Sequence, residues 1–158
     1  MQRRPLTDTD QADTPATSLA LLPAPTEPER GVRLPTVVIA DDHAGYREGL
    51  ARSLAEQGFD VIGEAADGPF ALALIQDLQP DIALVDVRMP GLDGIEVLQW
   101  LELQRCEVPV VLLSAFSEPE IVAAAHRAGA AGFIDKTAGR GAISGRLSAV
   151  VRARRPAA

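Results

Sequence analysis

The sequence predicts one α/β domain built on a parallel sheet with helices on both faces. Five short apolar runs, rich in β-branched residues, alternate with segments whose apolar residues recur at helical spacing. Strand–helix alternation of this kind is typical of parallel sheets, whose connections are right-handed crossovers. At 158 residues, the chain is long enough for one ordinary domain and a tail.

The first two strand–helix units are expected within residues 36–80. In chain order they are a strand over 36–40, a helix over 44–57, a strand over 59–65, and a helix from 67 or 68 to 78. Gly58 is expected to end the first helix and Pro80 to close the second. Residues 37–40 of the first strand are all apolar, as in strands that are buried on both faces.

Three more units follow. They are a strand over 82–86 with a helix from Asp93 through 101, a strand over 108–113 with a helix from 117 or 118 to 127, and a strand over 131–135 with a helix over 138–152. Asp93 is a suitable N-cap, and Pro119 stands at a tolerated first-turn position. Gly129 is expected to end the fourth helix.

Polar residues follow four of the five strands. They are the pair Asp41 and Asp42, then Asp86, Ser114 and Lys136, which is the only lysine beside fourteen arginines. Because ligands bind outside the carboxyl ends of parallel strands, these side chains are expected to meet at one edge of the sheet. Two simpler interpretations remain open: Asp86 caps the next turn, and the Asp pair (or Asp42 or His43 alone) caps the first helix.

Carboxylates held close together repel one another unless a cation neutralises them. Mg²⁺ is the natural partner, because it prefers oxygen ligands, so Asp41, Asp42 and Asp86 are candidate metal ligands. A carboxylate beside an ammonium and a hydroxyl also suits phosphoryl transfer to the carboxylate. Asp86 is the expected nucleophile because it lies at the centre of the group of polar strand ends, with Ser114 and Lys136 beside it.

Composition narrows the classes of function. The formal charge of −7 does not indicate a basic surface for nucleic-acid binding. No apolar stretch is long enough to span a membrane. The single cysteine, Cys106, excludes an internal disulfide and suits a reducing cytoplasm. Neither the G-x-G-x-x-G nor the G-K-[ST] nucleotide-binding motif is present.

Together these residues resemble the receiver domain of bacterial response regulators. The motifs are Asp41-Asp42, Asp86 with Met89-Pro90-Gly91, Ser114-Ala115 and Lys136, and Asp41-Asp42-His43 with Arg47-Glu48-Gly49-Leu50 looks most like the NarL-type subclass. The resemblance covers residues 36–152. It implies a CheY-like, flavodoxin-like (βα)5 fold with strand order 2-1-3-4-5.

The resemblance also implies roles for single residues. Asp86 would accept a phosphoryl group from a sensor histidine kinase, and Lys136 and Ser114 would contact that group. Asp41, Asp42, Asp86 and the backbone carbonyl of Arg88 would hold Mg²⁺. Phe133 stands where the family has its aromatic switch residue, paired with Ser114. Phosphorylation would then alter the surface formed by the fourth helix, fifth strand and fifth helix, for a partner or a second copy of the chain.

Some positions depart from the family's pattern. Ser114 stands where many members have Thr, and Thr137 stands where many have Pro after the lysine. Residues 1–35 are expected to form a disordered tail rich in Pro, Thr and Ala, and residues 153–158 a frayed C-terminus. NarL-type regulators continue into a helix-turn-helix domain. This chain stops at Ala158, so direct nucleic-acid binding is not expected of it. No membrane contact is expected either, because no long apolar stretch is present.

Two other classes of function can be weighed against a signalling receiver. A haloacid-dehalogenase-like phosphatase also forms an aspartyl-phosphate, but it needs a second Asp two residues after the nucleophile, where this chain has Arg88. A receiver-like module that acts by protein binding alone would not need the acidic pair, Asp86 and Lys136. A receiver that phosphorylates and dephosphorylates only itself, without substrate turnover, is therefore the expected function.

Overall fold

The computed structural model describes residues 31–155. The expected tail lies almost entirely outside these residues, so its disorder stays a prediction, and the frayed end is described only through Arg155. No helix within the described part has the length and apolar character that crossing a membrane requires.

The ten expected elements are present in the expected order. They are β1 (Thr36–Ala40), α1 (Ala44–Glu56), β2 (Asp60–Ala65), α2 (Gly68–Leu78), β3 (Ile82–Asp86), α3 (Gly94–Leu103), β4 (Val110–Ser114), α4 (Pro119–Arg127), β5 (Gly132–Asp135) and α5 (Arg140–Arg154). The predicted fold class is thereby confirmed.

The last helix differs from its expected bounds, because it starts at Arg140 and continues to Arg154. The late start has a local cause. The Asp135 carboxylate accepts hydrogen bonds from the backbone N–H (2.8 Å) and the hydroxyl (2.7 Å) of Thr137, which hold the segment after β5 in a turn. At the far end, Arg154 donates to the Glu107 carbonyl, which ties the end of α5 to the segment before β4.

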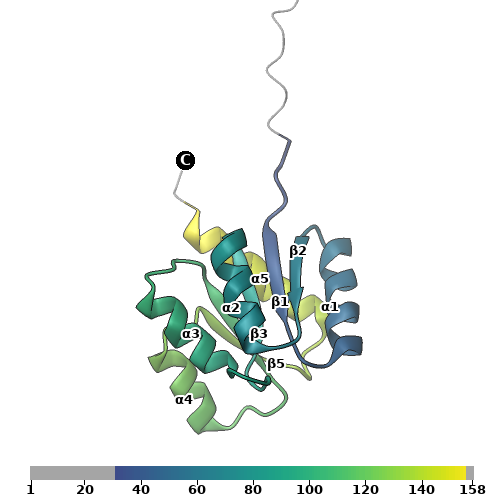
Figure 1. Cartoon of the computed structure of the whole chain (residues 1–158). Helices are drawn as coiled ribbons and strands as arrows, with labels where there is room; N and C mark the ends of the chain where they lie inside the picture. The colour runs from purple at the N-terminus through teal and green to yellow at the C-terminus, as the bar shows by residue number, and fades with distance from the viewer. Residues whose placement is uncertain (1–30, 156–158) are drawn as a thin grey trace, which may run out of the picture. The chain divides into compact units, whose positions relative to one another are not determined.

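The five strands form one parallel sheet in the order β2-β1-β3-β4-β5, as expected (Figure 1). Ala40 pairs with Val85, and Ser114 pairs with Asp135, so the carboxyl ends of β1, β3, β4 and β5 are aligned. β1 and β3 are neighbours at the point where the strand order reverses. In doubly wound sheets this is the place where ligands bind.

Helices cover both faces of the sheet, as Figure 1 shows. Because side chains alternate along a strand, Val37 and Ile39 face α1 and α5, whereas Val38 and Ala40 face α2, α3 and α4. The α1–α5 side is closed by Leu50, Leu54, Ile143 and Leu147, and the other side by Ala71, Ile75, Val97, Leu101 and Ala125. The buried apolar strands confirm the sheet predicted from the sequence.

Side-chain caps fix where three of the helices begin. The Asp67 carboxylate accepts from the Phe70 N–H at the start of α2, and Asp93 forms a capping box with Glu96 at the start of α3. His43 caps α1, since its Nδ1 accepts from the Tyr46 N–H at 3.0 Å. The first helix therefore does not use either residue of the Asp41-Asp42 pair as its N-cap.

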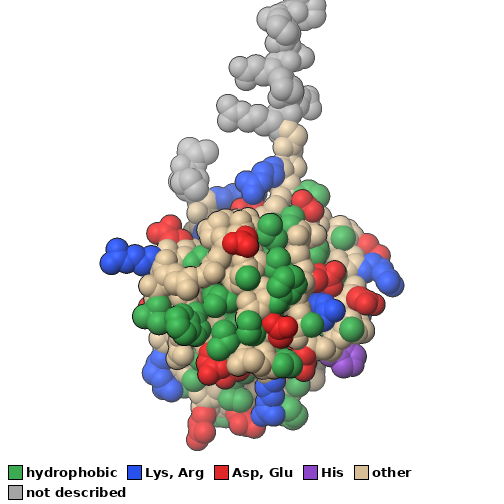
Figure 2. Space-filling view, viewed as in Figure 1, with side chains coloured by type: hydrophobic (Ala, Val, Ile, Leu, Met, Phe, Trp, Pro, Cys, Tyr) green, Lys and Arg blue, Asp and Glu red, His purple; other side chains and the backbone are tan. Residues whose placement is uncertain are grey.

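Several large apolar side chains remain exposed on α2 and α3. Phe70 and Leu78 on α2 are 50% and 41% exposed, and Trp100 and Leu103 on α3 are 47% and 75% exposed. Figure 2 shows hydrophobic side chains distributed over this face. Among the described residues, the exposed large hydrophobic side chains lie on these two helices, apart from Val32, Leu34 and Phe116.

Candidate active site

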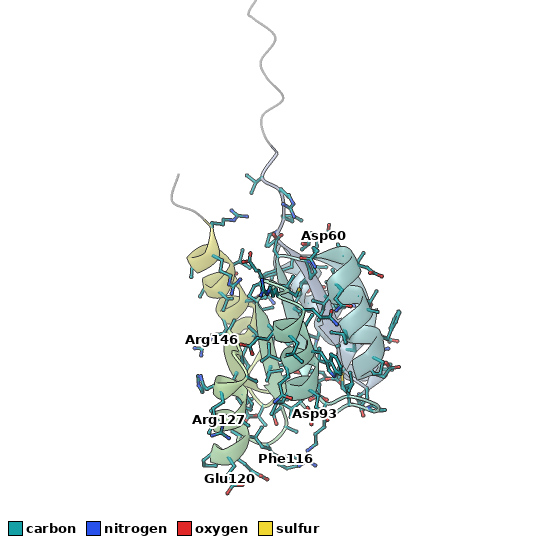
Figure 3. The ribbon with its side chains drawn as sticks, turned by 60° about the vertical axis from the view of Figure 1, so that its left-hand side comes forward. Asp60, Asp93, Phe116, Glu120, Arg127 and Arg146 are labelled. Atoms are coloured by element: carbon teal, nitrogen blue, oxygen red, sulfur yellow. The ribbon has the colours of Figure 1, made fainter. Side chains whose placement is uncertain are left out.

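Four of the strands deliver polar residues to one edge of the sheet. Asp41 follows β1, Asp86 ends β3, Ser114 ends β4 and Lys136 follows β5. Figure 3 shows Asp93 and Phe116, from the loops at this end, far from Asp60, which starts β2 at the opposite end. The strand-end cluster expected from the sequence is therefore assembled at the carboxyl edge.

Lys136 joins the two buried carboxylates of the cluster. Its Nζ lies 2.6 Å from Oδ2 of Asp41 and 3.1 Å from Oδ2 of Asp86. Asp41 is fully buried and Asp86 is only 5% exposed, so their charges are poorly screened by solvent. The only lysine in the chain thus provides a cation where two acidic side chains have been removed from water.

The pKa values of Asp86 and Lys136 are both shifted from their ordinary values. Burial raises the pKa of Asp86 above its ordinary value, and the neighbouring Asp41 charge raises it further, while Lys136 acts in the opposite direction. Burial acts to lower the pKa of Lys136, but hydrogen bonding to Asp41 and the charge of Asp86 outweigh it, and the pKa is raised. Lys136 therefore stays a cation at neutral pH.

The carboxylates also form a group that suits a divalent cation. Ligand oxygens of Asp41, Asp42 and Asp86 lie within 4.8 Å of one another, with Asp42 exposed and the other two buried. Three carboxylates at one accessible edge match the oxygen ligands of Mg²⁺, which usually retains several waters. The residues present therefore fit the metal, and Asp42 would be the ligand on the solvent side.

Glycine at position 94 lets the start of α3 lie against the backbone of the nucleophile candidate, Asp86. A Cβ at Gly94 would lie 2.4 Å from the Asp86 carbonyl oxygen, so only glycine lets α3 begin this close to the end of β3. Gly91 has a φ of +80°, which a side chain would strain, in the turn predicted after Asp86. The start of α3 therefore packs closely against the end of β3, which carries Asp86.

A family model described as the response regulator receiver domain matches residues 37–148. The chain belongs to this family. The resemblance predicted from the sequence is confirmed by the matched range, which contains every residue proposed for the receiver site.

Curated relatives agree with the assignment. The chain is 47% identical over 105 residues to the transcriptional regulatory protein NarL of Mycobacterium tuberculosis, a match that covers 66% of this chain and 49% of NarL. It is 38% identical over 104 residues to the response regulator GacA of Pseudomonas aeruginosa, covering 65% of this chain and 49% of GacA. The chain thus matches about half the length of these relatives.

Solved structures give the same receiver fold. The signal receiver domain of NarL from M. tuberculosis superimposes with a TM-score of 0.75 at 41% identity, covering 77% of this chain and 99% of that chain. CheY in a complex with CheX, BeF3 and Mg²⁺ from Borrelia burgdorferi gives a TM-score of 0.68 at 30% identity, covering 73% and 87%.

The receiver's hydroxyl residue, Ser114, is turned toward the β4–α4 loop. Its Oγ donates to the Phe116 carbonyl at 2.7 Å and accepts from the Phe116 N–H at 3.1 Å. Ser114 is buried, with 2% of its surface exposed. In this arrangement the hydroxyl stabilises the loop backbone.

The loops after β4 and β5 are joined by Asp135. Its Oδ2 accepts from the Ser117 hydroxyl at 2.6 Å, while Oδ1 accepts from Thr137. The hydrogen bonds from Ser117 and Thr137 lower the pKa of Asp135 to about 2. One ionised carboxylate thus connects the two loops beside the receiver site, a role that was not expected from the sequence.

The roles expected of Arg88 and Phe133 stay predictions. The Arg88 guanidinium lies 5.4 Å from the centre of the Phe116 ring, and the Arg88 backbone N–H bonds to the Asp86 carboxylate, acting to lower its pKa. Phe133 is partly buried against the core cluster on the α2–α3–α4 side. Its ring is therefore neither fully exposed nor fully buried in this structure.

Tyr46 was missed as a site residue. The Lys136 Nζ lies 4.7 Å from the centre of the Tyr46 ring, in cation–π geometry. Tyr46 falls within the helix expected over residues 44–57, and its ring packs against the α1–α5 cluster. Its spacing from Asp42 gave no separate signal, because the contact depends on where Lys136 reaches from β5.

Proposed function

We propose that this receiver domain accepts a phosphoryl group on Asp86 from a sensor histidine kinase and changes its surface in response. The observation that supports this most is the contact of Lys136 with both Asp41 and Asp86, at 2.6 and 3.1 Å. It places a fixed cation next to the carboxylate that would be modified. A phosphoryl group on Asp86 would then have a positive partner already in place.

In the proposed reaction, a carboxylate oxygen of Asp86 attacks the phosphorus of a phosphohistidine. An O–P bond forms, the P–N bond breaks, and the electron pair of that bond leaves with the imidazole nitrogen. Mg²⁺, when bound by Asp41, Asp42, Asp86 and the Arg88 carbonyl, would neutralise charge on the phosphoryl oxygens. Lys136 stabilises the same negative charge, and the Ser114 hydroxyl turns from Phe116 to donate to a phosphoryl oxygen.

The chain is proposed to be a signalling domain without substrate turnover. A haloacid-dehalogenase-like phosphatase would need a carboxylate two residues after Asp86, to act as a general acid and base. Arg88 stands there, and its guanidinium lies over Phe116. An arginine cannot take a proton from water at neutral pH, so the phosphoryl group would persist on Asp86 rather than be hydrolysed rapidly.

The expected output surface is formed by α4, β5 and α5. Figure 3 turns this side forward and shows Glu120 and Arg127 of α4 and Arg146 of α5 along it. These three side chains are exposed, so the surface carries charge of both signs. We propose that in the cytoplasm it contacts a downstream protein or a second copy of the chain once Ser114 and Phe133 have moved.

Labelling with a small phosphodonor, phosphoramidate with Mg²⁺, tests the proposal. The wild-type protein is expected to take up one phosphoryl group per chain, and Asp86→Asn none. Asp77→Asn, an exposed change on α2, is the matched control and should label as the wild type does. Rapid repeated turnover of the donor would favour the phosphatase alternative. Absence of label on the wild-type protein would favour a module that acts by binding alone.

A further inference from the structure

We infer that Tyr46 is a positioning residue for Lys136, which it holds in place for phosphoryl transfer to Asp86. The inference rests on the proposed function of Asp86 as phosphoacceptor. It goes further by assigning a role to an aromatic side chain that contributes no ligand and no nucleophile.

The backbone of Tyr46 is fixed in the first turn of α1. Its N–H donates to Nδ1 of His43 at 3.0 Å, and its ring packs against the α1–α5 core cluster. Arg47, the next residue, donates to the Asp41 carbonyl at 2.6 Å and contacts Glu64 at 3.4 Å. The ring therefore projects from a part of the helix that is attached to β1 and β2.

Lys136, in contrast, follows β5 and must reach past β4 to the acidic cluster at β1 and β3. Lysine carries its charge on a flexible four-carbon chain, so the position of the ammonium depends on its contacts. Three contacts surround it here: the carboxylates of Asp41 and Asp86, and the face of the Tyr46 ring at 4.7 Å. The two carboxylates form ion pairs with the ammonium, and the face of the ring contacts it as well.

The chemistry of the ring suits this role better than a charged or aliphatic side chain would. An aromatic face attracts a cation without neutralising it, so Lys136 keeps its charge for the phosphoryl oxygens. Burial raises the pKa of the Tyr46 hydroxyl, which leaves Tyr46 uncharged at neutral pH. The hydroxyl oxygen is buried and has no hydrogen-bond partner among the described residues, so the ring, not the hydroxyl, makes the contact that matters.

Tyr46→Leu removes the ring, whereas Tyr46→Phe keeps the ring and removes only the hydroxyl. Loss of a partly desolvated cation–π contact is expected to slow labelling by phosphoramidate at saturating Mg²⁺ by about threefold to tenfold. Tyr46→Phe is expected to label at the wild-type rate, within about twofold. If Tyr46→Leu does not fold, Tyr46→Met is an unbranched replacement for the same comparison.

A second readout depends on Lys136 being the only lysine in the chain. Protein carrying ¹³C-labelled lysine gives a single Lys Cε–Hε NMR signal. In the wild-type protein and Tyr46→Phe, the ring current should shift this signal upfield, and in Tyr46→Leu the shift should be lost. If Tyr46 had a purely structural role, Tyr46→Leu would have a lower melting temperature, but the lysine signal would not be expected to differ in this way between Tyr46→Phe and Tyr46→Leu.

The outcomes separate this inference from the proposed function. If the wild-type protein takes no label, Asp86 is not the acceptor, yet the NMR comparison still decides whether Tyr46 holds Lys136. Wild-type labelling with an unchanged rate or an unchanged lysine signal in Tyr46→Leu would overturn the inference. So would a Tyr46→Phe variant as slow as Tyr46→Leu, because the hydroxyl would then be the important group.

Discussion

Lys136 reaches from the end of β5 to Asp86 at the end of β3, placing its Nζ 3.1 Å from Oδ2 of the carboxylate. Strand β4 lies between the two strands, and Ser114 is its last residue. The same ammonium contacts Asp41, which is fully buried. One cation therefore serves as the counter-charge of a buried acidic pair and as the expected partner of a phosphoryl group.

Replacing Lys136 with Met should affect both stability and chemistry. Asp41 and Asp86 would lose the cation they share, and an uncompensated buried charge is costly. We expect the free energy of unfolding in urea to fall by about 3 kcal/mol at neutral pH. Labelling by phosphoramidate should fall by about 100-fold. Arg127→Met, an exposed change on α4, is the control and should alter neither quantity. Wild-type labelling by Lys136→Met would show that the ammonium does not assist transfer.

Asp86→Asn should stabilise the fold at neutral pH in the presence of a chelator. A carboxyl whose pKa is raised on folding binds its proton more tightly in the folded state, so its ionisation favours unfolding. The protonated carboxyl stabilises the folded state. This stabilisation is fully present below the ordinary pKa of 3.8 and is lost as the pH rises through the raised pKa. We expect the variant to melt higher than the wild type by on the order of 5 °C at neutral pH.

The difference in melting temperature should shrink as the pH is lowered toward the ordinary range for Asp, because wild-type Asp86 becomes protonated. Asp77→Asn, at an exposed position, should show no such pH dependence. A lower melting temperature for Asp86→Asn at neutral pH would mean that the Lys136 contact outweighs burial and the repulsion from Asp41.

Mg²⁺ binding should depend on the three clustered carboxylates. Asp41→Asn and Asp42→Asn are each expected to weaken the affinity measured by calorimetry at least about tenfold, because each removes a charged oxygen ligand. Asp60→Asn is the control, since Asp60 is exposed and starts β2 at the opposite end of the sheet. Unchanged affinity in Asp42→Asn would count against the proposed ligand set.

Asp135 should control the mobility of the β4–α4 loop. Asp135→Ala removes the acceptor of the Ser117 hydroxyl, so amide exchange in residues 115–118 should become faster. Because hydrogen bonding lowers the pKa of Asp135 to about 2, its ionised form holds the loop above that pH, and the effect fades only as the pH falls toward about 2. Exchange in this loop that is equally slow in Asp135→Ala would show that the Ser117 contact is not what restrains it.

Beryllofluoride, which imitates the phosphoryl group, should shift NMR signals from Ser114 through β5 to the start of α5. The Ser114 hydroxyl would leave the Phe116 backbone for the new acceptor, and Phe133 could then move inward. Ser114→Thr should retain these changes, because it keeps the hydroxyl, and Ser114→Ala should weaken them. Shifts confined to the surroundings of Asp86 would mean that the signal does not travel by this route.

Much of this architecture could be predicted from the sequence, because its strands are buried on both faces and its helices carry local stop signals. The runs at residues 36–40 and 82–86 are almost entirely apolar, and Asp67 and Asp93 cap the helices they were expected to start. The polar strand ends, Asp41, Asp86, Ser114 and Lys136, were also identifiable, since a parallel sheet brings its carboxyl ends together.

The remaining features depend on contacts between elements far apart in the chain. The cation–π contact of Tyr46 with Lys136 joins residues 90 positions apart in the chain. The Ser117–Asp135 hydrogen bond joins two loops, and it could not be read from either loop alone. The start of α5 was placed too early because the turn that Asp135 forms with Thr137 resembles a helix start in sequence.

The location of the label tests the central claim most directly. Wild-type protein treated with phosphoramidate and Mg²⁺ would be trapped, digested and fragmented by mass spectrometry, with Asp86→Asn treated in parallel. We expect a single phosphoryl group on Asp86 in the wild-type protein and an unlabelled variant. A stoichiometric label on any other residue, or a label that persists in Asp86→Asn, would contradict the assignment of Asp86 as the phosphoacceptor.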